Sequence, residues 1–72
     1  MLPLSLAGTG EDYTIKKIGG NPVVKKHLEN LGFNVGSKAQ VVTTNSGNLI
    51  VIVKETRVAI SREMAQKIMV KS

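Results

Sequence analysis

The sequence predicts a mostly β fold with one short helix, and three observations lead to this prediction. The second half of the chain is rich in Val and Ile, whose β-branched side chains favour strands. Within that half, Gly and Asn residues separate short apolar runs, as turns do between strands. A single stretch, between Asn21 and Gly32, instead carries its apolar residues at helical spacing.

The chain length and composition limit what the protein can be. With 72 residues, we expect a single domain, residues 1–72. No cysteine is present to form a disulfide or a thiolate metal site. No apolar run approaches the ~18 residues of a membrane span, and the opening MLPLSLAG lacks the basic flank of a signal peptide. The expected location is therefore the cytoplasm.

The first strand is predicted at Tyr13–Ile18, after an irregular lead-in of eleven residues that contains one proline and two glycines. Alternation in this strand is imperfect, because Ile15 and Ile18 are three residues apart. A bulge, or an early strand end near Gly19-Gly20, would turn both isoleucines inward.

A helix is predicted to begin at Asn21-Pro22. Asn is a strong N-cap, and Pro suits the first helical position because its missing N–H would have no helical partner there. The helix carries one apolar stripe at spacing i, i+4, i+7, flanked by Val23 and by a half-buried His27. The residues of this stripe are Val24, Leu28 and Leu31.

Gly32 is predicted to end the helix in a left-handed conformation, which glycine adopts without steric cost. In such an ending, Phe33 would pack on Leu28. The next four residues, Asn34–Ser37, predict a type II turn, because Gly36 occupies its third position.

Two longer strands follow, at Lys38–Thr44 and Asn48–Glu55, with Asn45-Ser46-Gly47 as the hairpin turn between them. Leu49–Val53 is apolar without a break, as in a strand that is covered on both faces or strongly coiled inside a small barrel. We expect most of it to be core. If an edge is exposed, that edge offers pairing to a partner's loop or strand.

The chain closes with a short strand at Arg57–Ile60, a helical turn at Ser61–Lys67 capped by Ser61, and a last strand at Ile68–Lys71. Five short strands, with a helix between the first and second and a helical turn before the last, predict a small SH3-like β-barrel. An oligonucleotide-binding-type barrel is the alternative, although that fold usually needs more residues.

The chain is basic, with ten Lys and Arg against five Asp and Glu, a net charge of +5 and a pI near 9.9. This excess indicates either a well-solvated surface or an anionic partner, which would be nucleic acid, an acidic protein surface or a lipid headgroup layer. Four lysines would lie close together if the helix packs beside the first strand, and the helix adds a histidine. These candidate partner-binding residues are Lys16, Lys17, Lys25, Lys26 and His27.

Nucleic acid is the less favoured of these partners. A platform for single strands needs exposed aromatic side chains on which bases stack. Tyr13 is the only candidate, since Phe33 is assigned to the helix end.

The sequence offers little for metal or covalent chemistry. His27 is the only imidazole, and Glu11-Asp12, the only adjacent acidic pair, reads as a solvated turn. No serine has a base and an orienting acid within evident reach, and Gly19-Gly20 lacks the lysine and hydroxyl of a phosphate loop. We therefore expect no enzyme activity, no small-molecule substrate, no cofactor and no metal ligands.

Four segments in this order resemble the ferrous-iron transport protein A family (FeoA). Leu4–Glu11 is similar to the family's opening, and Ile15–Gly20 to its first strand and exit glycine. Lys25–Val42 resembles the most diagnostic part, a basic helix ending in Leu-Gly, an apolar residue, and a glycine turn into a strand. Arg57–Val70 resembles the closing pattern.

The chain also departs from that pattern. Val35 stands where the family commonly has proline, and His27 where arginine is common. Asn45–Asn48 replaces a loop that often carries Pro and Leu beside Gly. At His27 and in this loop, therefore, no contact residue is transferred from the family.

The resemblance implies a small cytosolic accessory protein that binds the cytosolic part of a FeoB-type ferrous-iron transporter by protein–protein recognition. Peripheral membrane contact is compatible with such a role, and membrane insertion is not implied. A different family with a similar barrel, at the C-terminal end of iron-dependent repressors, suggests an alternative role as a stand-alone sensor-type domain. That role needs a DNA-binding helix-turn-helix, which these 72 residues do not contain.

Overall fold

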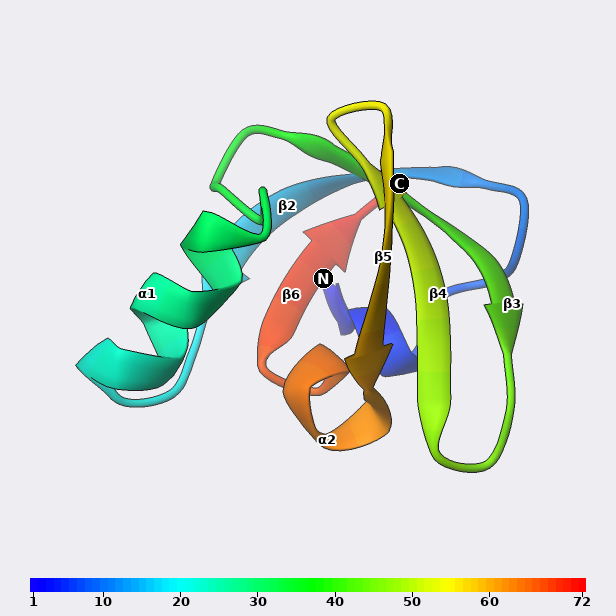
Figure 1. Cartoon of the computed structure of the whole chain (residues 1–72). Coiled ribbons are helices and arrows are strands. Elements are labelled where there is room, and N and C mark those ends of the chain that lie inside the picture. Colours follow the sequence, from blue (N-terminus) through cyan, green and yellow to red (C-terminus); the bar gives the residue numbers. More distant parts are fainter.

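One antiparallel sheet of six strands curls around the core of the protein (Figure 1). The computed structural model describes residues 1–72. Along the sheet the strands lie in the order β1-β6-β2-β3-β4-β5. Their bounds are Leu2–Pro3 for β1, Asp12–Ile18 for β2, Lys38–Thr44 for β3, Asn48–Val53 for β4, Thr56–Ser61 for β5 and Ile68–Lys71 for β6.

Two helices interrupt the strands. Helix α1 (Pro22–Asn30) connects β2 to β3, and the short α2 (Arg62–Ala65) precedes β6. The predicted order of these elements is confirmed. The prediction of five strands and of an irregular lead-in is wrong, because Leu2 and Pro3 pair with Val70 and Met69 as β1. A 3₁₀ turn, η1 (Leu4–Leu6), follows β1. Leu4 is fully buried, so the lead-in contributes to the core.

The core lies inside the curled sheet and consists of sixteen buried apolar or aromatic side chains. Alternation along the strands selects them: Leu49, Val51 and Val53 of β4 are buried, whereas Ile50 and Ile52 are half-buried on the outer face. The unbroken apolar run in β4 therefore has one face in the core and the other on the outside of the sheet. The prediction that most of this run is core is confirmed.

A bulge in β2 turns both isoleucines of that strand inward. The register of β2 against β6 shifts between Ile15 and Lys17, so that one extra residue is accommodated there. Ile15 and Ile18 are both buried as a result. This confirms the predicted bulge and gives the physical reason for the irregular spacing in the sequence.

The start of α1 follows the predicted capping. The Asn21 side chain accepts a hydrogen bond from the Val24 amide at 2.9 Å, and Pro22 occupies the first helical position. In the apolar stripe Leu28 is fully buried, while Val24 and Leu31 are partly buried against the core.

The end of α1 is a Schellman motif, as predicted. Gly32 has φ +106°, its amide donates to the Glu29 carbonyl, and the Phe33 amide donates to the Leu28 carbonyl, both at 3.0 Å. The following turn is also confirmed: Gly36 has φ +93°, and the Ser37 amide donates to the Asn34 carbonyl at 3.0 Å.

The turn between β4 and β5 differs from the prediction. Lys54 and Glu55 were expected to extend the strand, but both have positive φ, +51° and +63°. They form the two-residue connection of a tight hairpin, in which Val53 pairs with Thr56. Such turns usually contain Asn or Gly. Because this turn contains neither, it could not be predicted from the residue types.

The C-terminal elements match the prediction closely. The Ser61 hydroxyl accepts from the Met64 amide at 3.1 Å and caps α2. Strand β6 then pairs with β2 on one side and β1 on the other.

Candidate partner-binding surface

All five residues predicted to meet a partner are exposed, and they fall into two groups. Lys16 and Lys17 lie in β2, and Lys25, Lys26 and His27 are consecutive in α1. Residues 19–21 connect the two elements. The structure thus places a strand pair and a helix trio on neighbouring elements of the chain.

The strand pair owes its exposure to the β2 bulge. Consecutive residues of a regular strand point to opposite faces, so one of two adjacent lysines would face the core. The register shift between Ile15 and Lys17 interrupts this alternation. Lys16 and Lys17 are consequently both exposed, whereas Ile15 and Ile18 on either side are buried.

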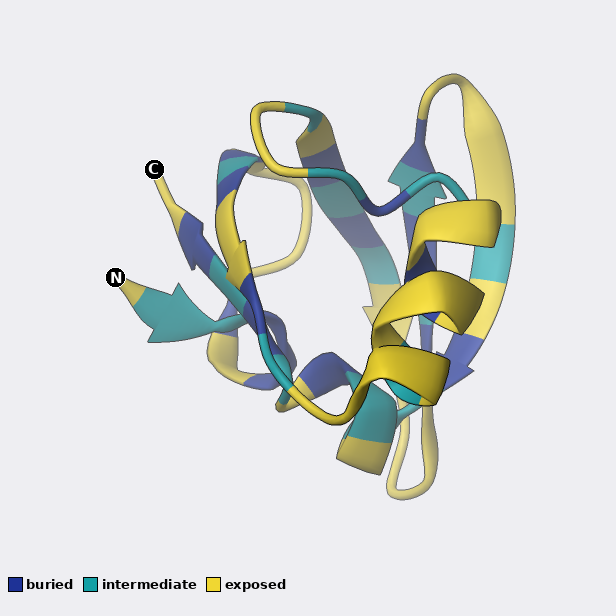
Figure 2. Cartoon of the chain, turned by 90° about the vertical axis from the view of Figure 1, so that its left-hand side faces the viewer, coloured by how far each residue is buried: buried dark blue, intermediate teal, exposed yellow.

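The helix trio lies on the outward side of α1, which Figure 2 shows as almost entirely exposed. The side chain of Val23 on the same helix is 78% exposed. The prediction of a half-buried His27 is wrong: only Leu28 is buried in α1, so the buried stripe is too narrow to reach its neighbour. His27 is therefore free to contact a partner together with the two lysines.

Neither aromatic side chain is available for stacking on a base. Phe33 is fully buried and Tyr13 is 6% exposed. The Tyr13 hydroxyl accepts from the Gly8 amide at 3.0 Å and donates to the Glu11 carboxylate at 2.9 Å. Tyr13 thus holds the loop before β2 in place, which contradicts its assignment as a possible stacking platform.

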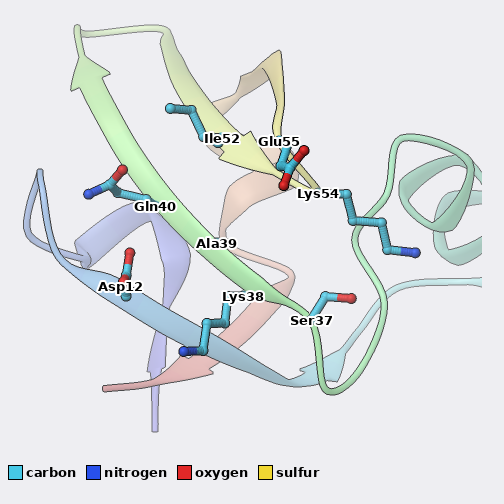
Figure 3. Close-up of a pocket in the computed structure, with 8 residues that line it drawn as sticks. All are labelled: Asp12, Ser37, Lys38, Ala39, Gln40, Ile52, Lys54 and Glu55. Carbon is cyan, nitrogen blue, oxygen red and sulfur yellow. The ribbon is translucent and has the colours of Figure 1, made fainter.

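A shallow hollow of about 340 Å³ opens on the outer face of the sheet, beside the tight turn between β4 and β5 (Figure 3). Its lining combines two carboxylates, two ammonium groups and polar or apolar side chains. These residues are Asp12, Ser37, Lys38, Ala39, Gln40, Ile52, Lys54 and Glu55.

This hollow was not predicted from the sequence, since none of its lining residues was among the predicted partner-binding residues. The structure assembles it from cross-strand neighbours: Asp12 pairs with Gln40, and Gln40 pairs with Ile52. Period-two alternation places these residues on the outer face of the sheet, and this alternation is the one feature of the sequence that could have indicated the hollow. Their juxtaposition depends on strand register, which residue pattern alone did not define.

The structure contains no group of three or more His, Cys, Asp or Glu side chains arranged to hold a metal ion. None of its helices has the length and apolar character needed to cross a bilayer. The surface offers exposed charge, sheet edges and a small hollow, which suit recognition of another molecule.

Comparison with known proteins identifies the family to which this chain belongs. The model of the FeoA domain matches residues 2–72. The chain belongs to the FeoA family. It is 39% identical over 70 residues to a Methanocaldococcus jannaschii protein assigned as an Fe(2+) transport protein A, covering 97% of this chain and 85% of the relative. FeoA is an accessory family of ferrous-iron transport, and the resemblance found in the sequence is confirmed.

Solved FeoA structures share this fold. The chain matches the crystal structure of an iron uptake regulatory protein (FeoA) with a TM-score of 0.92 at 28% identity, covering 97% of this chain and 95% of the other. It matches Stenotrophomonas maltophilia FeoA complexed with zinc, described as a prokaryotic SH3 domain protein, with a TM-score of 0.85 at 22% identity, covering 99% and 91%. The predicted SH3-like fold is thereby confirmed.

The same fold occurs in a larger regulator. A manganese-dependent transcriptional repressor in complex with manganese matches with a TM-score of 0.90 at 21% identity, covering 99% of this chain but 36% of the repressor. At this identity the match establishes the shared fold. The expected likeness was to the barrel of iron-dependent repressors; the matching repressor is manganese-dependent, so the likeness to a repressor barrel holds at the level of fold.

Proposed function

We propose that this FeoA-family chain is a cytoplasmic accessory protein of ferrous-iron uptake that binds the cytosolic part of a FeoB-type transporter. The observation that carries the proposal is the family match over residues 2–72, supported by the 39% identical Fe(2+) transport relative. Residues 1–72 act as one domain in this proposal, and recognition is by protein–protein contact without chemistry of its own.

In this proposal the exposed basic residues form the contact surface. Helix α1 contributes Lys25, Lys26 and His27 to this surface. Strand β2, which precedes the helix in the chain, contributes Lys16 and Lys17. A net charge of +5 favours approach to an acidic protein surface, since long-range attraction raises the association rate. The same charge permits peripheral contact with anionic lipid near the transporter.

The absence of an exposed aromatic side chain argues against the nucleic-acid alternative, because both Tyr13 and Phe33 are buried. A protein partner needs no such platform. The transporter is therefore preferred over nucleic acid as the partner.

Ferrous-iron uptake by cells tests this proposal. Cells that contain a FeoB-type transporter and lack their own FeoA are compared with and without this chain, and the initial rate of Fe²⁺ uptake is measured. The proposal predicts that the rate changes when the chain is present. A control strain without the transporter should show no effect of the chain. An identical uptake rate with and without the chain, at equal transporter levels, contradicts the proposal.

A further inference from the structure

Strand β5 forms one free edge of the sheet. It is the last strand in the order β1-β6-β2-β3-β4-β5, and it pairs only with β4 (Figure 1). An edge strand presents backbone donors and acceptors that can pair with another extended segment. The side of β5 turned away from β4 is therefore a candidate binding surface.

The hairpin register identifies which backbone groups face outward. Val53 and Thr56 close a two-residue turn, so they form a hydrogen-bonded pair. Hydrogen-bonded pairs then alternate along the ladder, and Val58 opposite Val51 is the next one. The amides and carbonyls of Arg57 and Ala59 point away from β4, and no hydrogen bond outside the regular helices and strands engages them.

The two edges of the sheet differ in how well they are protected. Strand β1 has only two residues, and one of them is Pro3. The short length and the proline each discourage pairing with another strand. Strand β5 has six residues without Pro or Gly, and its register against β4 is unbroken. The exposed Arg57 is its one charged side chain, and neither proline nor a bulge blocks backbone pairing along this edge.

We propose that the β5 edge receives an extended, acidic segment of the protein partner as an added strand. This inference rests on the proposed function and specifies how the partner is held. Arg57 is exposed on this edge, and the adjoining turn carries Lys54 and Glu55, whose charges offset each other, so the edge itself has a net positive charge from Arg57. Together with the net charge of +5, this charge favours a carboxylate-bearing segment. A second copy of this chain would bring the same positive charge and is disfavoured.

The side chains of β5 define the segment further. Val58 is half-buried and pairs with the core residue Val51, so an added residue beside Val58 is apolar. Arg57 points to the opposite face, where its neighbour on the added strand is Asp or Glu. The small side chain of Ala59 leaves room for a bulky neighbour on that outer face. The partner segment therefore alternates acidic and apolar residues.

Amide hydrogen exchange of the complex tests the inference. The ¹⁵N-labelled chain is mixed with the soluble cytosolic region of a FeoB-type transporter, and exchange rates are compared with those of the free chain. The amides of Arg57 and Ala59 are expected to exchange at least tenfold more slowly in the complex, because the added strand hydrogen-bonds them. The amide of Val58 serves as an internal control, since β4 already protects it in the free chain.

Substitutions at Ala59 and Arg57 make the test specific. Ala59→Pro removes an outward N–H without removing a β4 hydrogen bond, and is expected to weaken binding at least tenfold. Ala59→Ser keeps the N–H and a small side chain, and should bind like the unchanged chain. If Ala59→Pro does not fold, Arg57→Glu replaces it in the test: this variant keeps every backbone group and should weaken binding through charge repulsion.

The outcomes separate this inference from the proposed function. Binding of the transporter region without protection of Arg57 and Ala59 overturns the edge assignment and leaves the docking function standing. No binding by the unchanged chain overturns both. Protection of the same amides in the chain alone, together with a doubled mass at high concentration, would assign the edge to a second copy and overturn the acidic segment.

Discussion

The amide of Phe33 donates to the carbonyl of Leu28 at 3.0 Å, and both side chains are completely buried. This pair connects the end of α1 to the core of the barrel. The connection needs Gly32 between them, since its φ of +106° reverses the chain direction after the helix. The exposed basic face of α1 is thus held in place from its C-terminal end.

Gly32→Ala is expected to lower the free energy of unfolding by about 1 kcal/mol, because an L-residue adopts this backbone conformation at a cost. The added Cβ would meet only ordinary contacts, with Val53 Cγ1 at 3.5 Å. Gly32→Val should cost more. Urea denaturation measures both variants. Gly47→Ala, where a Cβ meets nothing within 4 Å, is the control, and equal midpoints for Gly32→Ala and Gly47→Ala would contradict the cap assignment.

Asn21→Ala tests the other end of α1. The side-chain hydrogen bond to the Val24 amide is lost, and the free energy of unfolding should fall by about 1 kcal/mol. The matched control is Asn30→Ala, an exposed position in the last turn of the same helix. Thermal unfolding followed by circular dichroism gives the comparison. If both variants unfold at the same temperature, the cap at Asn21 does not stabilise the helix.

The positive φ values of Lys54 and Glu55 in the turn between β4 and β5 are predicted to destabilise the folded protein, and substitution should relieve this cost. Replacing Lys54 and Glu55 together by Asn and Gly should raise the free energy of unfolding by about 1 kcal/mol, because Asn-Gly suits two consecutive positive φ values. The control replaces both by Ala, which retains the unfavourable conformation. Chemical denaturation decides, and a gain for the Ala pair equal to that for Asn-Gly would rule out the backbone explanation.

Most of the fold could be predicted because local chemistry and tertiary packing agree in this chain. Asn21, Gly32 and Gly36 each satisfy a local conformational requirement that is visible in the residue type. The β2 bulge was one of the two arrangements that the spacing of Ile15 and Ile18 indicated, since regular alternation would place only one of them in the core.

The parts that could not be predicted depend on partners distant in the sequence. Strand β1 exists because Leu2 and Pro3 lie beside Val70 and Met69, and two residues carry no strand pattern of their own. The Lys54–Glu55 turn is set by the register of β4 against β5, against the preference of both residues. The hollow beside this turn was missed for the same reason.

The basic face of α1 is predicted to contribute to binding of the transporter. Lys26→Glu should weaken the affinity for the soluble cytosolic region by about fivefold, as expected for an exposed charge near an acidic surface. Lys71→Glu makes the same charge change at an exposed residue of β6 and is the control. Calorimetric titration at low and at physiological salt measures both. An equal loss for the two variants would indicate that net charge alone, and not the α1 face, governs binding.

Binding of this chain to the cytosolic part of a FeoB-type transporter, as proposed above, can be followed residue by residue in a chemical-shift titration. The ¹⁵N-labelled chain is titrated with the transporter's soluble nucleotide-binding region, and every backbone amide is followed. We expect saturable shifts confined to a contiguous surface that includes α1 residues Lys25–His27 or the β5 edge. A spectrum unchanged up to a large excess of the transporter region would contradict the proposed binding.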